Sequence, residues 1–146
     1  MHRFLIVTMI LGSTVAFADS IEEKRQKADA EKLVEFDVKS MNKACKTTMP
    51  ETGVIDWASW KTIVDDKNNK ASSACKYVAY GMGNLCRGDK IAQETVAKDV
   101  KKLSCMGDSA DDITFELKGD TLVVHTRLGV KDTDKKTKTW LSKNLQ

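Results

Sequence analysis

Three side chains near the C-terminal end of the chain carry groups that could perform acid–base catalysis. Glu116 and His125 could donate and accept protons, and Arg127 could stabilise negative charge on a phosphate group. Small secreted ribonucleases use such groups on a β-sheet to act on the 2′-hydroxyl of RNA. Solvated hairpins also carry charged pairs, which protect the sheet edge. The trio therefore supports one hypothesis, a secreted hydrolase such as a ribonuclease that uses His125 with Glu116.

No second catalytic motif accompanies this trio. The chain has two histidines, and the other, His2, lies at the extreme N-terminus. The sequence lacks the Gly-x-Ser-x-Gly motif of many serine hydrolases and a glycine loop that would bind phosphate. Its histidines and cysteines match no metal-binding spacing, so we predict no metal and no cofactor.

Four cysteines are the most unusual feature of the composition, at positions 45, 75, 86 and 105. They contain no Cys-x-x-Cys pair, which a redox site or a zinc knuckle would need. Four cysteines in a chain whose first 18 residues have the pattern of an export signal predict two structural disulfides, with three possible pairings.

Expected secondary structure narrows these pairings. Cys75 and Cys86 lie in one predicted helix, about 16 Å apart, which is too far for a disulfide. Residues 90–99 are expected to form a helix, and residues 101–106 a returning strand of similar length. Because the strand returns over nearly the same distance that the helix covers, Cys105 would lie beside Cys86. We therefore predict the disulfides Cys45–Cys75 and Cys86–Cys105. The alternative, Cys45–Cys86 with Cys75–Cys105, would follow if residues 100–106 stayed helical.

The first 18 residues have the pattern of an export signal. Arg3 precedes an apolar stretch over residues 4–17, and Ala16 and Ala18 fit the small residues that signal peptidase requires. The apolar stretch spans about 21 Å as a helix, less than the roughly 30 Å of a hydrocarbon core. We predict that residues 1–18 are cleaved, that residues 19–146 form one domain, and that the protein is exported to the periplasm or outside a bacterial cell. No other stretch predicts a transmembrane segment.

Lysines cluster in a predicted C-terminal helix that begins near Asp132 or Asp134. Lys135, Lys136 and Lys138 could bind an envelope or extracellular protein, an anionic polymer or lipid headgroups. A solvated helix face would have the same composition. The formal charge of the chain is only +3, which does not favour nucleic acid as the partner.

Hydrophobic periodicity predicts helices in the first two thirds of the mature chain. In the first of them, a buried stripe is expected at Val34, Val38, Met41 and Cys45. Trp57 and Trp60 could line a groove, although indoles at this spacing are more typical of core packing. Gly81 and Gly83 lie inside the helix expected over residues 72–86. Either a neighbouring backbone comes close there, or the helix breaks.

Two β-strands are predicted at residues 113–118 and 121–128, joined by a two-residue turn at Gly119 and Asp120. In this register Phe115 faces Val124 on the core side, and Thr114 faces His125 on the solvated side. With the strand at 101–106, the pattern predicts an α+β fold: several helices packed on a small three-stranded antiparallel meander, with two disulfides.

The composition is that of an ordinary globular domain. The chain has 146 residues, of which 41% are hydrophobic and 31% charged, and this excludes collagen-like and low-complexity sequences. We expect a small, exported, non-enzymatic protein that binds an envelope-associated partner, with the hydrolase as the alternative.

Overall fold

A computed structural model describes residues 21–60 and 70–145 of the chain. The predicted signal, residues 1–18, lies outside the described residues. The elements run in the order α1 (Ile21–Cys45), β1 (Ile55–Asp56), α2 (Trp57–Trp60), α3 (Lys70–Gly88), α4 (Lys90–Asp99), β2 (Lys102–Gly107), β3 (Thr114–Lys118), β4 (Thr121–Thr126) and α5 (Thr133–Asn144). In this part of the chain, none of the helices has the length and apolar character that crossing a membrane requires.

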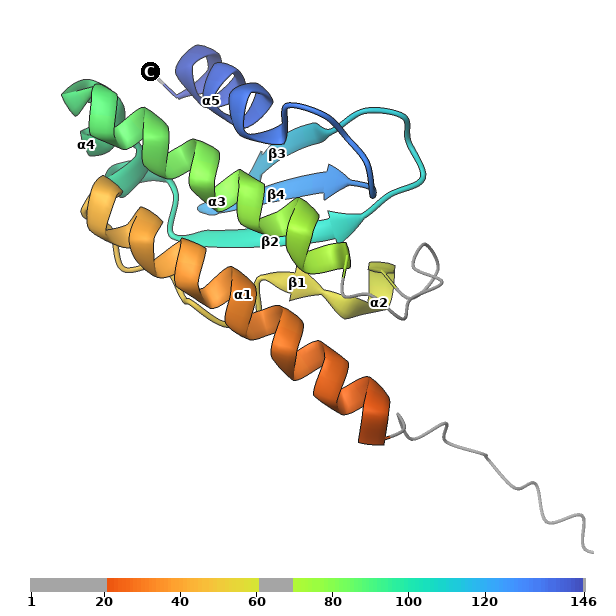
Figure 1. Cartoon of the computed structure of the whole chain (residues 1–146). Helices are drawn as coiled ribbons and strands as arrows, with labels where there is room; N and C mark the ends of the chain where they lie inside the picture. The colour runs from red at the N-terminus through yellow and green to blue at the C-terminus, as the bar shows by residue number, and fades with distance from the viewer. Residues whose placement is uncertain (1–20, 61–69, 146) are drawn as a thin grey trace, which may run out of the picture.

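The fold is α+β, with helices on one side of a four-stranded mixed sheet (Figure 1). The strand order is β1-β2-β4-β3, in which β2 pairs in parallel with both β1 and β4. The predicted three-stranded antiparallel meander is therefore wrong. The hairpin itself is confirmed, because β3 and β4 are antiparallel and Phe115 pairs with Val124.

Burial explains why β4 is an interior strand of the sheet and β3 an edge strand. Leu122, Val123 and Val124 form a continuous buried run in β4, whereas most of β3 is exposed. A meander would have placed Glu116 and Lys118 in the central strand, so their charges would have been partly desolvated. Pairing β2 with the far side of β4 buries the apolar strand and leaves the charged strand at an edge.

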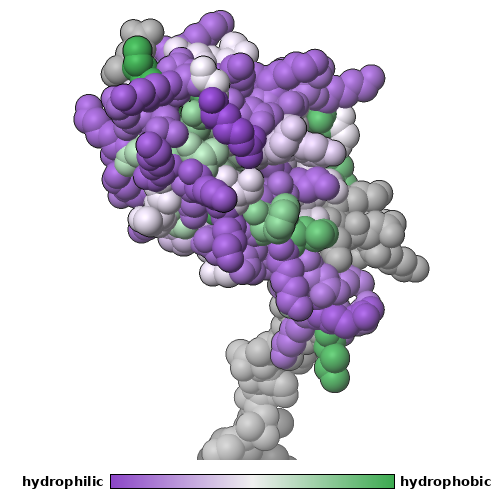
Figure 2. Space-filling view, turned by 60° about the vertical axis from the view of Figure 1, so that its left-hand side comes forward, coloured by the Kyte–Doolittle hydropathy of each residue, from purple (hydrophilic) through white to green (hydrophobic). Residues whose placement is uncertain are grey.

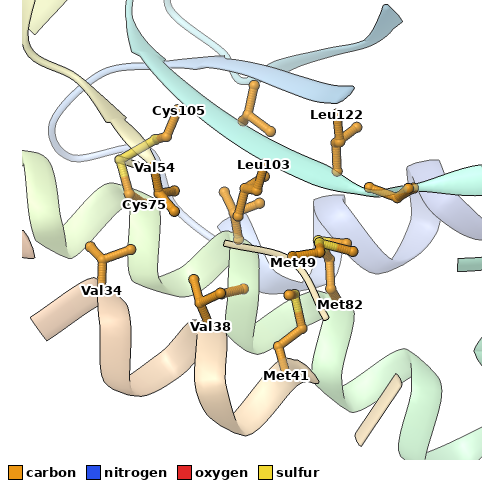
Figure 3. Packing of buried hydrophobic residues seen from close by; sticks show 14 of the residues in the cluster. Val34, Val38, Met41, Met49, Val54, Cys75, Met82, Leu103, Cys105 and Leu122 are labelled. Atoms are coloured by element: carbon orange, nitrogen blue, oxygen red, sulfur yellow. A yellow bond between two sulfur atoms is a disulfide. The ribbon is translucent and has the colours of Figure 1, made fainter. Parts of the chain in front are cut away.

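The core lies between the sheet and the three long helices, α1, α3 and α5 (Figure 1). The predicted stripe on α1 is confirmed, because Val34, Val38 and Met41 are at most 1% exposed and point toward α3 and the sheet (Figure 3). The first nine residues of α1 contribute no buried side chain, so the helix begins in solvent and joins the core at Ala30.

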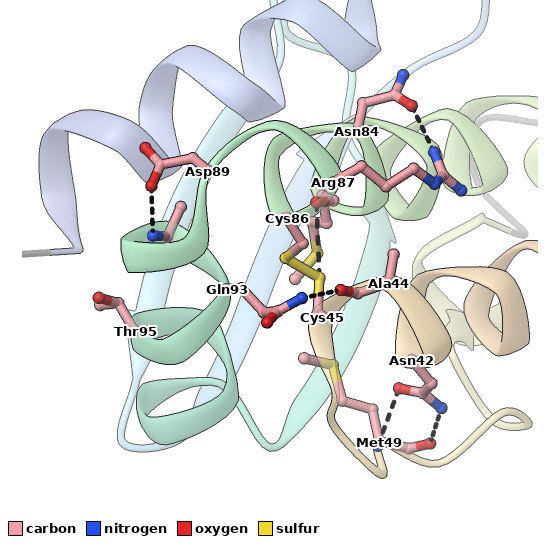
Figure 4. The surroundings of a disulfide bond; sticks show 12 residues. Asn42, Ala44, Cys45, Met49, Asn84, Cys86, Arg87, Asp89, Gln93 and Thr95 are labelled. Carbon is pink, nitrogen blue, oxygen red and sulfur yellow. Dashed lines mark hydrogen bonds between the residues drawn. A yellow bond between two sulfur atoms is a disulfide. The ribbon is translucent and has the colours of Figure 1, made fainter.

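The predicted disulfide pairing is wrong, and the alternative pairing is present. Cys45 at the end of α1 is bonded to Cys86 near the end of α3 (Figure 4). Cys75 in α3 is bonded to Cys105 in β2 (Figure 3). The strand expected near residues 101–106 does form, so the error lies in the path of the chain before it.

The path of α4 accounts for this correction. Instead of extending the line of α3, α4 turns across the ends of α1 and α3, where Gln93 Nε2 donates a hydrogen bond to the Ala44 carbonyl at 2.6 Å (Figure 4). α4 therefore does not carry the chain away from Cys86 along the line of α3, and β2 does not bring it back to the level of Cys86. β2 instead runs back along α3, and it carries Cys105 past the level of Cys86 to that of Cys75.

Candidate functional site

Glu116 and Arg127, two members of the predicted catalytic trio, are held in separate ion pairs. Glu116 Oε2 lies 3.1 Å from Lys118 Nζ, and Glu116 faces Val123 across the hairpin. Arg127 Nη2 lies 2.8 Å from Asp111 Oδ1. Arg127 Nε is buried and makes no hydrogen bond within residues 21–60 and 70–145. The carboxylate and guanidinium of the hydrolase hypothesis therefore have other partners.

His125, the third member, lies in the central strand beside a different carboxylate. Its Nδ1 is 3.8 Å from Asp108 Oδ2, and both side chains are part-exposed. Its neighbours across the sheet are Thr114 in β3 and Met106 in β2. Asp108 could orient the imidazole, but a histidine and an aspartate alone lack the cation that would stabilise a phosphorane. Each member of the trio therefore has a different oppositely charged neighbour in the described structure.

A shallow groove with a volume of about 350 Å³ lies between β3 and α5, and we call it the lysine groove. It is lined by Asp112, Ile113, Phe115, Lys135, Lys136, Thr139, Trp140, Lys143 and Asn144. The rings of Phe115 and Trp140 stack in it, with centroids 5.5 Å apart and planes inclined by 26°. Flat apolar rings beside ammonium groups suit a ligand that combines apolar surface with negative charge.

The periodicity of α5 explains which lysines reach the groove. Lys136, Trp140 and Lys143 are spaced i, i+4, i+7 and so share one helix face. Lys138 lies about 200° around the helix from Lys136 and is not among the lining residues. Of the three lysines singled out from the sequence, the structure therefore brings Lys135 and Lys136 to the groove and leaves Lys138 outside it.

Sequence reasoning missed Phe115 and Trp140 as members of this site. From the sequence, Trp140 is expected on the apolar stripe of its helix with Leu141 and Leu145, with the lysines elsewhere on the helix surface. Phe115 comes from the core side of β3, and nothing in the local sequence shows that this strand lies beside α5. A helix stripe that mixes aromatic and basic residues was the available signal.

Ion pairs hold two of the groove lysines in place. Lys136 Nζ lies 2.5 Å from Asp112 Oδ1. This bond, with a further hydrogen bond from the Ile113 amide, lowers the pKa of Asp112, so the carboxylate stays ionised. Lys135 Nζ lies 3.0 Å from Asp132 Oδ1, which lowers the pKa of Asp132 and raises that of Lys135.

The groove has a positive balance of charge. Its lining contains three lysines and one aspartate, an excess of two basic groups. Lys143 has no ion-pair partner in the described part of the chain, and it is exposed. An incoming anion would therefore meet Lys143 without displacing an existing partner.

Other hollows border the helices, and one of about 250 Å³ is lined by Tyr77, Arg127 and Val130. A groove of about 300 Å³ between α4 and α5 is mainly apolar and includes Leu85, Ile91 and Leu141. A smaller one between α1 and α3 contains Asp37, Lys76, Tyr77 and Tyr80. Burial raises the pKa of Asp37, and the charge of Lys76 opposes this effect. The face in Figure 2 is mainly hydrophilic, with apolar side chains in small separate patches.

The predicted tryptophan pair serves packing rather than a groove. Trp60 is 1% exposed, and its indole nitrogen donates to the Cys105 carbonyl at 3.1 Å. Trp57 Nε1 donates to Glu31 Oε1 at 3.0 Å, which joins α2 to α1. Within residues 21–60 and 70–145, no group of three or more His, Cys, Asp or Glu side chains is placed to hold a metal ion.

Comparisons of the chain with protein-family models, with curated proteins and with solved structures find no match.

Proposed function

We propose that the protein is an exported, non-enzymatic binding domain and that the lysine groove binds an anionic partner. The observation that carries this proposal is the stack of Phe115 on Trp140 between basic side chains. The rings offer apolar contact area, and the lysines offer charge, so the groove can bind a partner that neither feature would bind alone.

Export and an envelope location are part of the proposal. Two disulfides, each joining elements far apart in the sequence, are typical of proteins in oxidising compartments. The composition of residues 1–18 supports a cleaved signal, and the place of action would be the periplasm or the outside of a bacterial cell. Candidate partners in that setting are an envelope or extracellular protein and an anionic polymer.

One observation supports the hydrolase alternative: His125 Nδ1 lies 3.8 Å from Asp108 Oδ2. A ribonuclease that used His125 with Glu116 would need their side chains to converge on one substrate. Glu116 instead pairs with Lys118, and Arg127 with Asp111. The binding function is therefore the one that the geometry supports better.

Two polyanions of different chemistry test the binding function. Fluorescent poly-L-glutamate and dextran sulfate would be titrated with the full mature chain, at low and at high ionic strength, and followed by anisotropy. Replacing Lys135 and Lys143 by glutamine should weaken binding about tenfold, because two charges that face the ligand are lost.

The matched control removes two charges outside the groove. Lys131→Gln with Lys138→Gln changes the net charge by the same amount. Lys138 lies on α5, and Lys131 lies in the turn just before this helix. We expect this double variant to bind within about threefold of the wild type. Equal losses in the two double variants, or no binding of either polyanion by the wild type, would contradict the proposal.

A further inference from the structure

Among the described strands, the outer edge of β3 has no partner, and it lies directly beside the lysine groove. β3 is the last strand in the order β1-β2-β4-β3, and no described strand pairs with its far side. A strand edge presents backbone N–H and C=O groups that can pair with another extended chain.

The register shows which groups face outward. The carbonyls of Asp120 and Thr126 accept hydrogen bonds from Lys102 and Asp108, on the side of β2. Backbone direction alternates along a strand, so residues 121, 123 and 125 of β4 face β3. Their pairing partners, residues 114, 116 and 118, face back toward β4.

Phe115 and Leu117 therefore direct their N–H and C=O groups away from the sheet. Leu117 is 36% exposed, which is high for a large apolar side chain. Both side chains lie on the helix side of the sheet, the side on which Phe115 meets Trp140 in the groove. Free backbone groups, exposed apolar surface and positive charge thus occur together at one edge.

We propose that the partner is an extended peptide segment with acidic side chains, which adds to β3 as a further strand. Main-chain hydrogen bonds to Phe115 and Leu117 would provide affinity. Alternate side chains of the segment would point toward the lysine groove, where apolar ones meet Trp140 and acidic ones meet Lys143. The other side chains would pass over the Glu116–Lys118 pair, which is already neutral.

The charge of the groove favours this occupant over a second copy of the chain. Two copies joined through their β3 edges would bring two positively charged grooves to the same junction, and like charges there oppose association. A polymer without amides would leave the outward N–H and C=O groups unpaired. An acidic peptide satisfies both the backbone groups and the lysines.

The inference rests on the proposed function and names the partner of the same groove. The test begins with a displayed library of nine-residue random peptides, selected on the full mature chain and synthesised in soluble form. Each selected peptide is then prepared with single N-methyl groups along its backbone. If the peptide adds as a strand, methylation of every second amide weakens binding about tenfold or more, and methylation of the intervening amides changes it less than about threefold.

A pair of variants at one position tests the edge of β3 itself. Leu117→Pro removes the outward N–H, and proline is tolerated where that group faces solvent on an edge strand. Leu117→Ala removes the side chain but keeps the N–H. We expect the proline variant to lose about tenfold more affinity than the alanine variant, with unchanged circular dichroism in both. The methylation series still decides the question if the proline variant fails to fold.

Each result bears on one of the two proposals. Selected peptides rich in Asp and Glu, with an alternating methylation pattern, support the strand. The strand inference fails while the binding function stands if the polyanions bind through Lys135 and Lys143 but methylation shows no alternation or selection yields no acidic peptide. A concentration-dependent dimer that Leu117→Pro abolishes would assign the edge to a second copy and overturn the inference.

Discussion

Gly81 in α3 lies against the backbone of Asp134 in α5, so closely that a methyl group on Gly81 would collide with the Asp134 carbonyl. The glycine lets the first turn of α5 pack directly on α3. This contact places α5 along the sheet and so positions the helix that forms one wall of the lysine groove.

Gly81→Ala should destabilise the protein by about 1–3 kcal/mol, because the added carbon forces α5 away from α3. Gly83→Ala is the matched control in the same helix. There an added carbon would lie 3.5 Å from Met41 Cα, an ordinary contact, and alanine favours helix by up to about 1 kcal/mol. Urea unfolding of both variants measures the difference. Similar losses of stability would show that the close approach to Asp134 is not what requires glycine.

The disulfide pairing can be read directly from a tryptic digest without reduction, because each cysteine lies in a different peptide. We expect residues 44–46 linked to 77–87, and residues 71–76 linked to 103–118. Mass spectrometry identifies the pairs. A linkage between 44–46 and 71–76 would instead support the pairing expected from the sequence and contradict the arrangement of α4 and β2.

Asp37→Asn should stabilise the protein at neutral pH. Burial raises the pKa of Asp37 in the folded state, so stability falls as pH rises from the ordinary value of 3.8 through the folded pKa. Above that range the folded protein contains an ionised, partly desolvated carboxylate, which asparagine removes. Thermal unfolding of both proteins between pH 3 and pH 8 should show an advantage for the variant that disappears toward about pH 4. Asp29→Asn, at an exposed site on α1, controls for loss of charge, and an equal gain there would contradict the expectation.

Incubation of the mature protein with RNA tests the hydrolase alternative. We expect no cleavage above the level of a His125→Ala variant, because Glu116 and Arg127 are paired away from His125. Gel analysis of a labelled single-stranded RNA gives the rate. If wild type cleaves RNA and His125→Ala loses about a hundredfold or more of the activity, the imidazole is a catalytic group and the binding function alone is insufficient.

Much of the local structure was predictable, because short-range physics determines it. The buried stripe of α1 follows from apolar side chains at helical spacing, and the β3–β4 register follows from a two-residue turn at Gly119. The N-cap of α4 was also predictable, because Asp is a favoured N-cap residue, and Asp89 accepts hydrogen bonds from the amides of Ile91 and Ala92.

The candidate site was predictable only in part. Lys135 and Lys136 could be singled out because lysines cluster in this part of the sequence. Lys138 was grouped with them because composition does not show which face of the helix lies beside β3. The catalytic role of Glu116, His125 and Arg127 stays a prediction, and the sequence did not show which charged groups lie beside them. Register placed them on one hairpin, but Lys118, Asp108 and Asp111 were not expected as their partners.

What the sequence determined by itself was therefore the helices, three of the four described strands and their apolar faces, together with the presence of two disulfides; strand β1 was not predicted. The tertiary structure alone decided the strand order, the pairing of Cys45 with Cys86, and the meeting of Phe115 with Trp140. The physical reason is that periodicity, capping and turns act over a few residues. The direction of α4 and the central place of β4 instead depend on burying apolar surface from segments far apart in the chain.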